Sequence, residues 1–416
     1  MNIILLGPRE PIPPTRGGAI EKLTYGLARS LASKGQNVTV ISTCEGGYGT
    51  NEVNDVKIIC LSRPIPGKIY SKEMLDFSRK AHRVLERALA ELTSNDAIVH
   101  SVYFYNLISF PSFNKIPIVI TEFEHYPWIP EYLYHYPFIS TYRRIRWEAD
   151  SRIRKMLAKI IAPRASKIVF ISRFQCQQFL KNVKIPEFKC TIIPNAVDIN
   201  SYRPMNVHGL RDEIADGAEV VLLFVGRLTP HKGLHFLLKA IAKLTPSYRK
   251  RIKLVVIGPR APGFRPDPKT SLKLDKYVAY IDFLIRQHEL DNIVRFLGQV
   301  HESELPLYYN AVDMLVHPSL VEAFGLVIIE AMACGKPVLA LRIPPLNEII
   351  ADGETGILAD HTPRSLAEKL SYVVDNIGEV RKMGIRGRRV VEERYSWDVI
   401  SDKYLRLYDT LLSRRK

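Results

Sequence analysis

Short apolar runs alternate along this chain with longer segments of helical spacing, and this alternation constrains the fold more than any other feature. Asn2–Leu6 is predicted to be a buried strand, Ala19–Ser33 an amphipathic helix and Val38–Ile41 the next strand. Further strands are predicted near 56–61, 97–100, 117–121, 167–171 and 191–193, and helices at about 72–92, 143–161 and 173–181. Strands separated by helices form βαβ units, so the pattern predicts a parallel sheet.

The alternation stops once and then restarts. Residues 194–217 are polar and contain prolines and glycines, which is typical of a linker. Val220–Val225 is then predicted to be a strand and Leu234–Leu244 a helix, with more strands near 253–257, 293–297, 312–316 and 337–341. A chain of 416 residues suits two domains. We therefore expect two doubly wound, Rossmann-like α/β domains facing a central cleft, since such folds bind ligands beyond the carboxyl ends of their strands.

Composition and cysteine usage narrow the class of protein. Hydrophobic residues make up 46% and charged residues 25% of the chain, which is typical of soluble globular proteins. The five cysteines are scattered with no C-x-x-C pair, so we expect neither a zinc site nor a disulfide framework, and a reducing compartment. No apolar run reaches the roughly 18 residues of a membrane span. The N-terminus lacks the pattern of a signal peptide, and we expect a cytoplasmic protein.

Positive charge is concentrated in one segment. The chain has a net charge of +16, and residues 143–189 contain 13 basic and 3 acidic side chains. This segment follows an aromatic-rich stretch, 123–142, which suits a sugar platform, a membrane interface or the packing of an irregular loop. We expect an anionic partner, either an anionic membrane surface at the inner face of the membrane or a lipid-linked or phosphorylated acceptor. No nucleic-acid recognition motif is present.

The helix predicted at 143–161 has two kinds of side chain. Its basic residues lie off an apolar stripe, which we expect to pack into the core as in an ordinary surface helix. The stripe consists of Ile145, Ala149, Ile153, Met156, Leu157, Ile160 and Ile161. In the second half, 259–271 contains four prolines and no periodicity, and we expect an irregular loop there.

Three segments are candidates for binding an anionic ligand. Gly17 and Gly18 precede the first predicted helix. Glycines let the backbone approach a ligand closely, and a helix N-terminus favours an anion; the alternative is an ordinary tight turn. Arg227 and Lys232 follow the strand 220–225 and offer a guanidinium fork and a point charge to phosphate oxygens; two solvated loop cations are the alternative.

The third segment contains two glutamates eight residues apart. Glu322 is predicted to precede a helix and Glu330 to lie about two turns into it, a helical rise of about 12 Å. Between them, the amides of Ala323, Phe324, Gly325 and Leu326 would form a helix N-terminus suited to a diphosphate. Carboxylates accept hydrogen bonds from sugar hydroxyls. The alternative is two unrelated helix acids, although Glu330 sits among apolar residues where an unpaired acid is costly.

These motifs resemble those of the family 4 retaining nucleotide-sugar glycosyltransferases, which have the GT-B fold. The resemblance rests on Phe-Val-Gly-Arg-Leu-Thr-Pro-His-Lys-Gly and on the Glu-x7-Glu segment within 317–338. Ile193–Asp198, 346–358 and Tyr-Ser-Trp-Asp at 395–398 also match. The resemblance implies an N-terminal acceptor-side domain over 1–198, a donor-binding domain over 199–395 and a C-terminal helix, 396–416, that crosses back to the first domain.

The resemblance also implies roles for individual residues. Arg227 and Lys232 would hold the diphosphate, Glu322 the donor sugar and Glu330 the ribose hydroxyls, with Gly18 facing the diphosphate from the first domain. A UDP- or GDP-sugar would be the donor, and a glycan, lipid-linked or phosphorylated molecule the acceptor. The family needs no metal or other cofactor, and the sequence shows no D-x-D motif and no His/Cys cluster.

The sequence departs from the family at one position. Phe123 occupies the place where the family often has a histidine at the end of a strand. His125 could take over its catalytic role, as could Glu122 or Glu124, or His125 could be an ordinary loop residue. The function predicted is hexosyl transfer with retention. The alternative is a non-catalytic nucleotide- or anion-binding protein on the same scaffold, against which the intact set of Arg227, Lys232, Glu322 and Glu330 argues.

Overall fold

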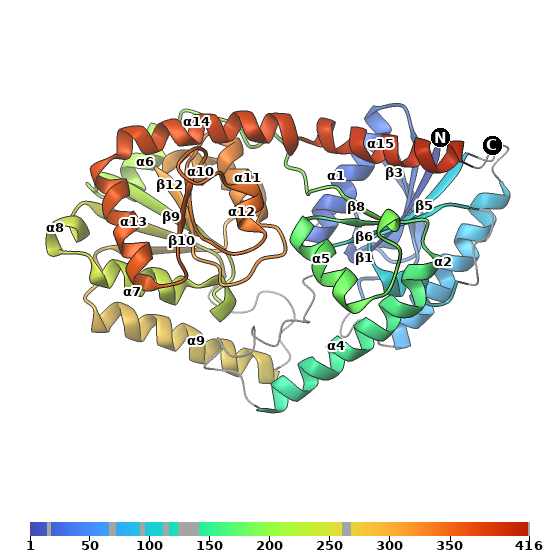
Figure 1. Cartoon of the computed structure of the whole chain (residues 1–416), viewed down its shortest axis with the longest axis horizontal. Coiled ribbons are helices and arrows are strands. Elements are labelled where there is room, and N and C mark those ends of the chain that lie inside the picture. Colours follow the sequence, from blue (N-terminus) through green and yellow to red (C-terminus); the bar gives the residue numbers. More distant parts are fainter. Residues whose placement is uncertain are drawn as a thin grey trace. The chain divides into compact units, whose positions relative to one another are not determined.

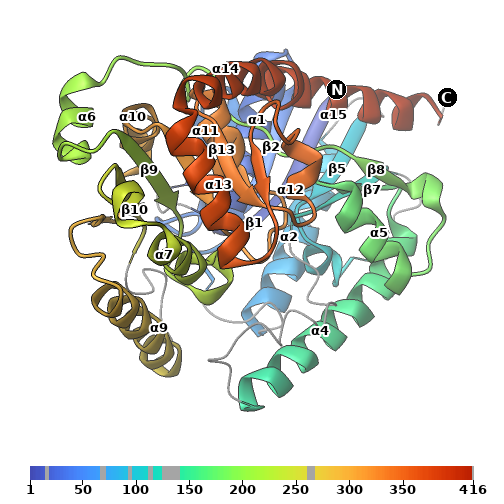
Figure 2. The same ribbon diagram turned by 60° about the vertical axis from the view of Figure 1, so that its left-hand side comes forward.

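The computed structural model describes residues 1–14, 18–65, 72–91, 96–110, 116–123, 141–259 and 268–414, which form two compact units. The first unit contains the described residues up to Phe123, then Tyr142–Ala196, and finally the chain from Trp397 onward. The second unit contains Val197–Ser396. Each unit is an α/β domain built around its own sheet (Figures 1 and 2).

The sheet of the first unit has the strand order β3-β4-β2-β1-β5-β6-β7-β8. Its strands are β1 (Asn2–Pro11), β2 (Asn37–Thr43), β3 (Gly49–Val53), β4 (Val56–Cys60), β5 (Ala97–Ser101), β6 (Ile118–Glu122), β7 (Lys167–Phe170) and β8 (Cys190–Ile192). Its helices are α1 (Ala19–Ser33), α2 (Lys72–Ala90), α4 (Thr141–Ile161), α5 (Arg173–Asn182) and α15 (Trp397–Ser413). The βαβ pattern predicts parallel strands, and all neighbouring strands are parallel except β3 and β4, which are antiparallel.

Alternation along β1 shows why helices cover both faces of this sheet. Ile3 and Leu5 join the core cluster that α1 and α15 complete, whereas Ile4 and Leu6 join the cluster of α2, α4 and α5. Successive side chains of a strand point to opposite faces, so one apolar run supplies both cores.

The antiparallel strand β3 is absent from the sequence prediction. Its residues Gly-Thr-Asn-Glu-Val are polar and mostly exposed, so it has no apolar signature. Asn54 and Asp55 both adopt positive φ, 52° and 59°, between β3 and β4. Two residues of positive φ form the tight turn that suits the twist of a β-hairpin, and this turn rather than burial explains β3.

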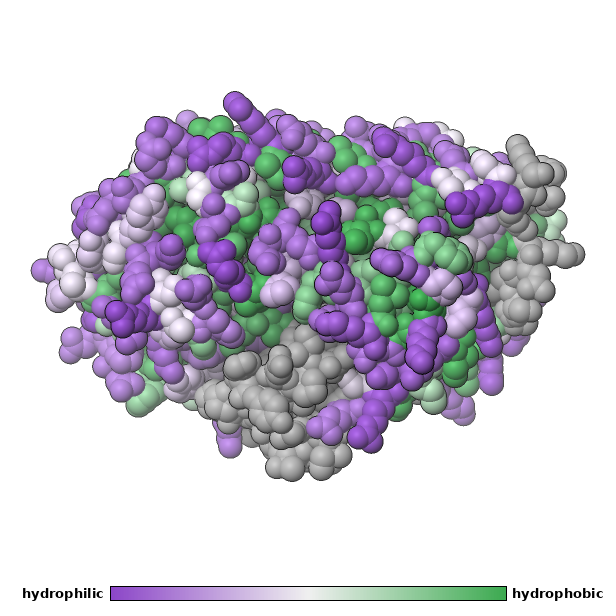
Figure 3. Space-filling model, viewed as in Figure 1, coloured by the Kyte–Doolittle hydropathy of each residue, from purple (hydrophilic) through white to green (hydrophobic). Residues whose placement is uncertain are grey.

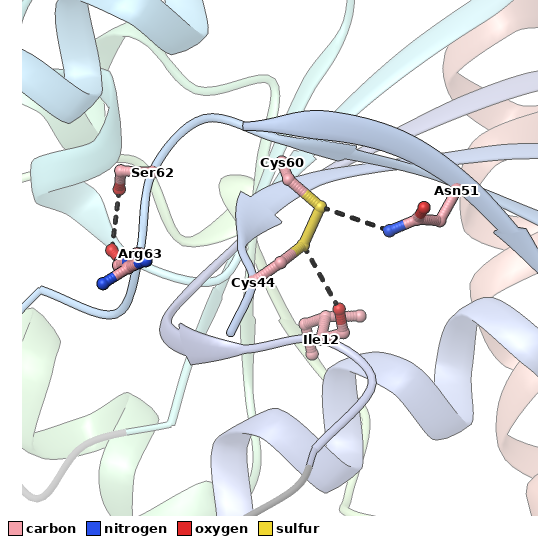
Figure 4. The surroundings of a disulfide bond; sticks show 6 residues. All are labelled: Ile12, Cys44, Asn51, Cys60, Ser62 and Arg63. Atoms are coloured by element: carbon pink, nitrogen blue, oxygen red, sulfur yellow. Dashed lines mark hydrogen bonds between the residues drawn. A yellow bond between two sulfur atoms is a disulfide. The ribbon is translucent and has the colours of Figure 1, made fainter. Parts of the chain in front are cut away.

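A disulfide joins Cys44 to Cys60, contrary to the expectation from cysteine spacing (Figure 4). Ser42 of β2 pairs with Cys60 of β4, so the parallel register brings both cysteines to the same edge of the sheet although they are 16 residues apart in the sequence. Sequence spacing cannot reveal such a contact. The cysteine pattern therefore no longer supports a reducing compartment.

The last helix completes the first unit through polar contacts as well as packing. His100 is fully buried, and its ring nitrogens lie 2.6 Å from the Tyr408 hydroxyl and 2.7 Å from the Thr121 hydroxyl. Burial lowers the pKa of His100 to about 3, so this histidine is neutral. On the outer side of α15, Lys34 of α1 pairs with Asp398 and Asp402. His100 is thus a structural residue that anchors the C-terminal helix.

The second unit has a six-stranded parallel sheet with the order β11-β10-β9-β12-β13-β14. Its strands are β9 (Val220–Val225), β10 (Ile252–Ile257), β11 (Val294–Gly298), β12 (Met314–His317), β13 (Val338–Leu341) and β14 (Ile357–Ala359). Its helices are α6 (His208–Ala215), α7 (Leu234–Lys243), α8 (Pro246–Arg249), α9 (Pro268–Gln287), α10 (Leu305–Ala311), α11 (Leu326–Ala333), α12 (Leu346–Ile349), α13 (Pro363–Asp375) and α14 (Ile377–Arg394). The central strands β9 and β10 are buried along their whole length.

Two predicted irregular segments contain helices. Within 194–217, α6 is held by Arg211, whose guanidinium donates to the buried Asp313 carboxylate over 2.7 Å. This ion pair lies in the tertiary structure and leaves no periodic signal in the sequence. In the proline-rich segment, α9 begins at Pro268, where a proline is tolerated in the first turn.

The apolar stripe of α4 is only partly in the core, which corrects the expectation for this helix. Of the stripe residues, Ile161 is buried and Leu157 partly buried, but Ile153, Met156 and Ile160 are 36%, 53% and 48% exposed. The exposed three are spaced i, i+3 and i+7, so they lie along one side of the helix. The stripe is wider than the surface that the sheet can cover.

Candidate active site

The loop after β9 is shaped by two glycines. Gly226 follows the strand, and Gly233 adopts φ +74° between the short turn Pro230–Lys232 and α7. A Cβ on Gly233 would lie 1.9 Å from the Pro318 carbonyl oxygen, and one on Gly258, after β10, would lie 1.9 Å from the Gly226 carbonyl oxygen. The loops beyond β9, β10 and β12 therefore approach one another more closely than any side chain would allow.

Hydrogen bonds join the loop after β9 to the loop after β12. The His231 carbonyl accepts a bond of 2.8 Å from the Leu320 amide and one of 3.1 Å from the Ser319 hydroxyl. The two loops thereby form one rigid edge at the carboxyl ends of the parallel strands, where α/β sheets bind ligands.

This edge brings Lys232 and Glu322 into direct contact. The Lys232 ammonium donates to Glu322 Oε1, and His317 Nε2 lies 2.9 Å from the same oxygen. His317 is the last residue of β12. The structure thus brings together two of the predicted site residues and adds a third that the sequence prediction missed.

Burial and charge fix the protonation of this cluster. Burial alone would raise the pKa of Glu322, but the Lys232 ammonium and the His317 hydrogen bond hold it well below its usual value. Burial lowers the pKa of His317, so its ring is neutral and its Nε2–H donates to the carboxylate. Glu322 is therefore ionised at neutral pH, with Oε1 engaged by both neighbours.

Arg227 differs from Lys232 in exposure. Its side chain is exposed, and its carbonyl accepts a bond of 2.8 Å from the Thr229 amide, which fixes the backbone of the loop. Lys232, by contrast, has a side chain only 22% exposed. The site thus contains one solvated cation and one cation held by a buried acid.

The segment between the two glutamates is helical only from Leu326 onward. Gly325 adopts φ +105° as the N-cap residue, and α11 begins only at Leu326. Glu330 is therefore just over one turn into the helix rather than two, and the estimated rise of about 12 Å between the acids does not apply. Phe324 is buried, and its ring packs edge-on against Tyr395 with centroids 5.9 Å apart.

Glu330 is a half-buried acid with a defined partner. The Tyr309 hydroxyl of α10 donates to Glu330 Oε2 over 2.8 Å. Tyr309 is fully buried, and sequence reasoning missed it because its position, 21 residues before Glu330, carries no motif. The Glu330 carboxylate, although it has apolar neighbours in the sequence, is thus paired with a buried hydroxyl.

The first unit contributes fewer described candidates. Gly18 is the N-cap residue of α1, with φ −106° and ψ 141°, and its carbonyl accepts from the Lys22 amide. A Cβ on Gly18 would lie 1.8 Å from a Glu21 carboxylate oxygen. The Glu122 carbonyl, at the end of β6, accepts a bond of 3.0 Å from the Gln175 side chain. Gly17, Glu124 and His125 lie outside the described residues, and their predicted roles stay predictions.

Comparisons with known proteins match both halves of the chain. Residues 211–390 match the family described as glycosyl transferases group 1, and residues 17–201 match glycosyltransferase family 4. The chain belongs to the family 4 glycosyltransferases. Its two Rossmann-like domains with parallel sheets agree with this assignment.

Relatives and solved structures extend the comparison. D-inositol 3-phosphate glycosyltransferase 2 of Catenulispora acidiphila is 32% identical over 232 residues, which are 53% of this chain and 51% of the relative. The chain thus spans about half the length of this curated relative. Sucrose-phosphate synthase of Thermosynechococcus elongatus has a TM-score of 0.78 at 22% identity over 99% of both chains. Anabaena HepE in complex with UDP-glucose has a TM-score of 0.71 at 19% identity, covering 99% of this chain and 100% of HepE. These structures share the fold.

Two features are absent from the described ranges. None of their helices combines the length and hydropathy needed to cross a membrane. No three His, Cys, Asp or Glu side chains in these ranges gather where they could hold a metal ion.

Proposed function

We propose that this glycosyltransferase moves a hexose-type sugar from a nucleotide-diphosphate donor to a glycan, lipid-linked or phosphorylated acceptor, with retention of the anomeric configuration. The observation that carries the proposal is the Lys232–Glu322–His317 cluster beside Arg227 at the carboxyl edge of the second sheet. Its cations would stabilise a leaving diphosphate, and its ionised carboxylate would accept hydrogen bonds from sugar hydroxyls. The relative named for inositol 3-phosphate and the HepE complex with UDP-glucose agree with such substrates.

In the proposed reaction the bond between the anomeric carbon and the diphosphate oxygen breaks, and the oxygen keeps the electron pair. The acceptor hydroxyl attacks the same face of the sugar, and its proton passes to the leaving diphosphate. Arg227, Lys232 and the N-terminus of α11 would stabilise the developing negative charge, which is commonly the largest catalytic contribution. With this charge supplied by the chain, we propose a step that needs no metal ion or other cofactor.

A panel of UDP-, GDP- and ADP-sugars tests the donor class. A donor that binds only the folded state raises the melting temperature, and proton NMR of the product then reports its anomeric configuration. Arg227→Ala should lower turnover by about 100-fold or more, whereas Arg364→Ala, an exposed arginine on α13, should not. Binding of the nucleotide sugar without turnover with any acceptor would favour the non-catalytic alternative. Equal turnover in the two variants would refute the role of Arg227.

We also propose that the first unit meets an anionic membrane surface through 143–189. Residues 151–186 contain nine basic side chains and no acidic one. Arg152 and Lys159 are exposed on α4 beside Ile153, Met156 and Ile160. Figure 3 shows hydrophilic surface along the course that α4 takes in Figure 1. An exposed helix face that mixes cations and apolar side chains suits the interface of an anionic bilayer, and the enzyme would then act at the inner face of the membrane.

Sedimentation with vesicles tests this surface. Wild-type protein should sediment with phosphatidylglycerol vesicles at low salt and less as salt rises, but not with phosphatidylcholine vesicles. Reversal of Arg152 and Lys159 to glutamate should abolish binding, whereas Lys382→Glu, on α14 of the other unit, should not. Binding that ignores lipid charge would refute the membrane proposal. Self-association detected by size-exclusion chromatography would assign the exposed face to a second copy of the chain.

A further inference from the structure

Tyr309 is a buried tyrosine whose only polar side-chain atom is directed at a site residue. It lies on α10 and has no exposed surface. Its hydroxyl donates to Glu330 Oε2 over 2.8 Å. Burial, together with the nearby Glu330 charge, raises the pKa of Tyr309 well above its usual value, so the hydroxyl keeps its proton and acts as a donor.

The position of this hydroxyl is fixed by the residues around it. Asn310, next in sequence, accepts from the Met205 amide over 2.9 Å and donates to the Arg203 carbonyl over 2.9 Å. Lys336, just beyond α11, donates to the Asn310 carbonyl over 2.8 Å. These bonds connect α10 to the segment 203–205 and to the residues that follow α11, the helix that contains Glu330. Donor and acceptor therefore belong to one rigid group.

A second clamp holds the same, C-terminal end of α11. The Arg388 guanidinium donates to the Ala333 carbonyl over 2.6 Å and to the Tyr202 carbonyl over 2.7 Å. The Tyr202 ring in turn packs against the Tyr309 ring, with centroids 6.0 Å apart at 61°. Neither ring can turn without disturbing this packing, so the Tyr309 hydroxyl cannot follow a carboxylate that changes rotamer.

We propose that Tyr309 is a positioning residue that holds the Glu330 carboxylate in the orientation that accepts a ribose hydroxyl, and that this bond makes the site prefer ribonucleotides. The inference rests on the proposed function and on the role that the family resemblance implies for Glu330, which is to bind the donor ribose. A carboxylate already fixed before the ligand arrives loses no rotamer freedom on binding, which improves affinity through preorganisation. The benefit exists only for a ligand that has the hydroxyl.

Tyr202 offers a matched control for this test. It is a buried tyrosine in contact with Tyr309, and its hydroxyl has no hydrogen-bond partner among the described residues. Tyr202→Phe and Tyr309→Phe therefore delete the same atom from neighbouring rings of one cluster. Only the second deletion removes a bond to Glu330.

The experiment measures the affinity of each variant for two probes. One is whichever of UDP, GDP and ADP binds the wild-type protein most tightly, and the other is its 2′,3′-dideoxy analogue. Tyr309→Phe should weaken binding of the ribonucleotide by about fivefold to tenfold, the loss of one charge-assisted contact. It should leave the affinity for the dideoxy analogue unchanged. The ratio of the dideoxy dissociation constant to the ribonucleotide dissociation constant should therefore fall by the same factor. Tyr202→Phe should keep the wild-type ratio.

The possible outcomes distinguish failure of the role proposed for Tyr309 from failure of the proposed function. Failure of the wild-type protein to bind any of the three nucleotides would overturn both. Nucleotide binding with a wild-type ratio in Tyr309→Phe, or equal weakening of both probes, would overturn the role of Tyr309 alone. The effect of Tyr309→Phe should also disappear in a Glu330→Gln background. If Tyr309→Phe does not fold, Tyr309→His, which keeps a ring N–H donor, must retain a ratio above that of Glu330→Gln, and a lower ratio refutes the inference.

Discussion

Removing the Lys232 ammonium should expose how much the second unit depends on its buried ion pair. In Lys232→Met the Glu322 carboxylate loses its cation but stays buried, and among the described residues His317 remains as its donor. Removing one partner of a buried pair costs about 3–5 kcal/mol of unfolding free energy. The Lys232 and Glu322 side chains are 22% and 10% exposed, so partial solvation reduces the expected loss to about 2–3 kcal/mol.

The loss should depend on pH in a defined direction. In the wild-type protein the pKa of Glu322 is well below its usual value, so its ionisation stabilises the fold above the unfolded pKa of about 4.3. This contribution is lost as the pH falls through the folded pKa. Without Lys232 burial dominates and raises the pKa of Glu322, so ionisation then opposes folding. The difference between the two proteins should therefore grow from pH 4 to pH 7, because over this range Glu322 of the variant ionises at the expense of the fold while Glu322 of the wild-type protein is already ionised.

Urea unfolding followed by circular dichroism at the two pH values is the measurement. A second change, Glu322→Gln, should restore at least half of the loss because it removes the stranded charge. Lys253→Met is the control: Lys253 is also buried, but its partner Asp216 is 72% exposed and simply returns to water. A loss in Lys232→Met that is equal at both pH values, or that Glu322→Gln does not reduce, would refute this account of the site.

Three further predictions concern the fold. Replacing Cys44 and Cys60 by serine should lower the unfolding free energy by about 3 kcal/mol, as expected for a bond closing a loop of 16 residues, and dithiothreitol should destabilise the wild-type protein but not the variant in urea unfolding. Gly233→Ala should destabilise the second unit far more than Gly298→Ala in thermal melts: both have φ +74°, but only at Gly233 would a Cβ strike a backbone oxygen. Tyr408→Phe should cost about 1–3 kcal/mol by leaving a His100 ring nitrogen without its partner, and a melting temperature equal to wild type would contradict this role.

The sequence predicts those elements whose signal is local. The helix α1 and the strand β9 were predicted with the bounds that they have, because the first has clear apolar spacing and the second is six apolar residues without interruption. The strand β14 has only three residues, too few for any periodicity. The helix α6 depends on the ion pair between Arg211 and Asp313, which are 102 residues apart, and its own sequence is typical of a linker.

The site divides in the same way. Arg227, Lys232 and the two glutamates were identified because each belongs to a contiguous motif next to a strand end. His317 is only five residues from Glu322, but its role depends on the backbone turning between them. Tyr309 meets Glu330 because α10 and α11 pack together, and no spacing rule anticipates that contact. The sequence predicts the charges that are proposed to face a ligand. It does not reveal the groups, His317 and Tyr309, that hold those charges in place.

The helix α15 has a consequence for the order in which this protein is made. The first unit leaves the ribosome without it, and the intervening 200 residues, Val197–Ser396, must be translated before the helix follows. At about 5–20 residues per second this takes about 10–40 s. During that time the apolar face that Tyr404 and Tyr408 later cover is open to water or to chaperones. The newborn first unit is therefore an unfinished domain, and full-length translation is the step that closes its core.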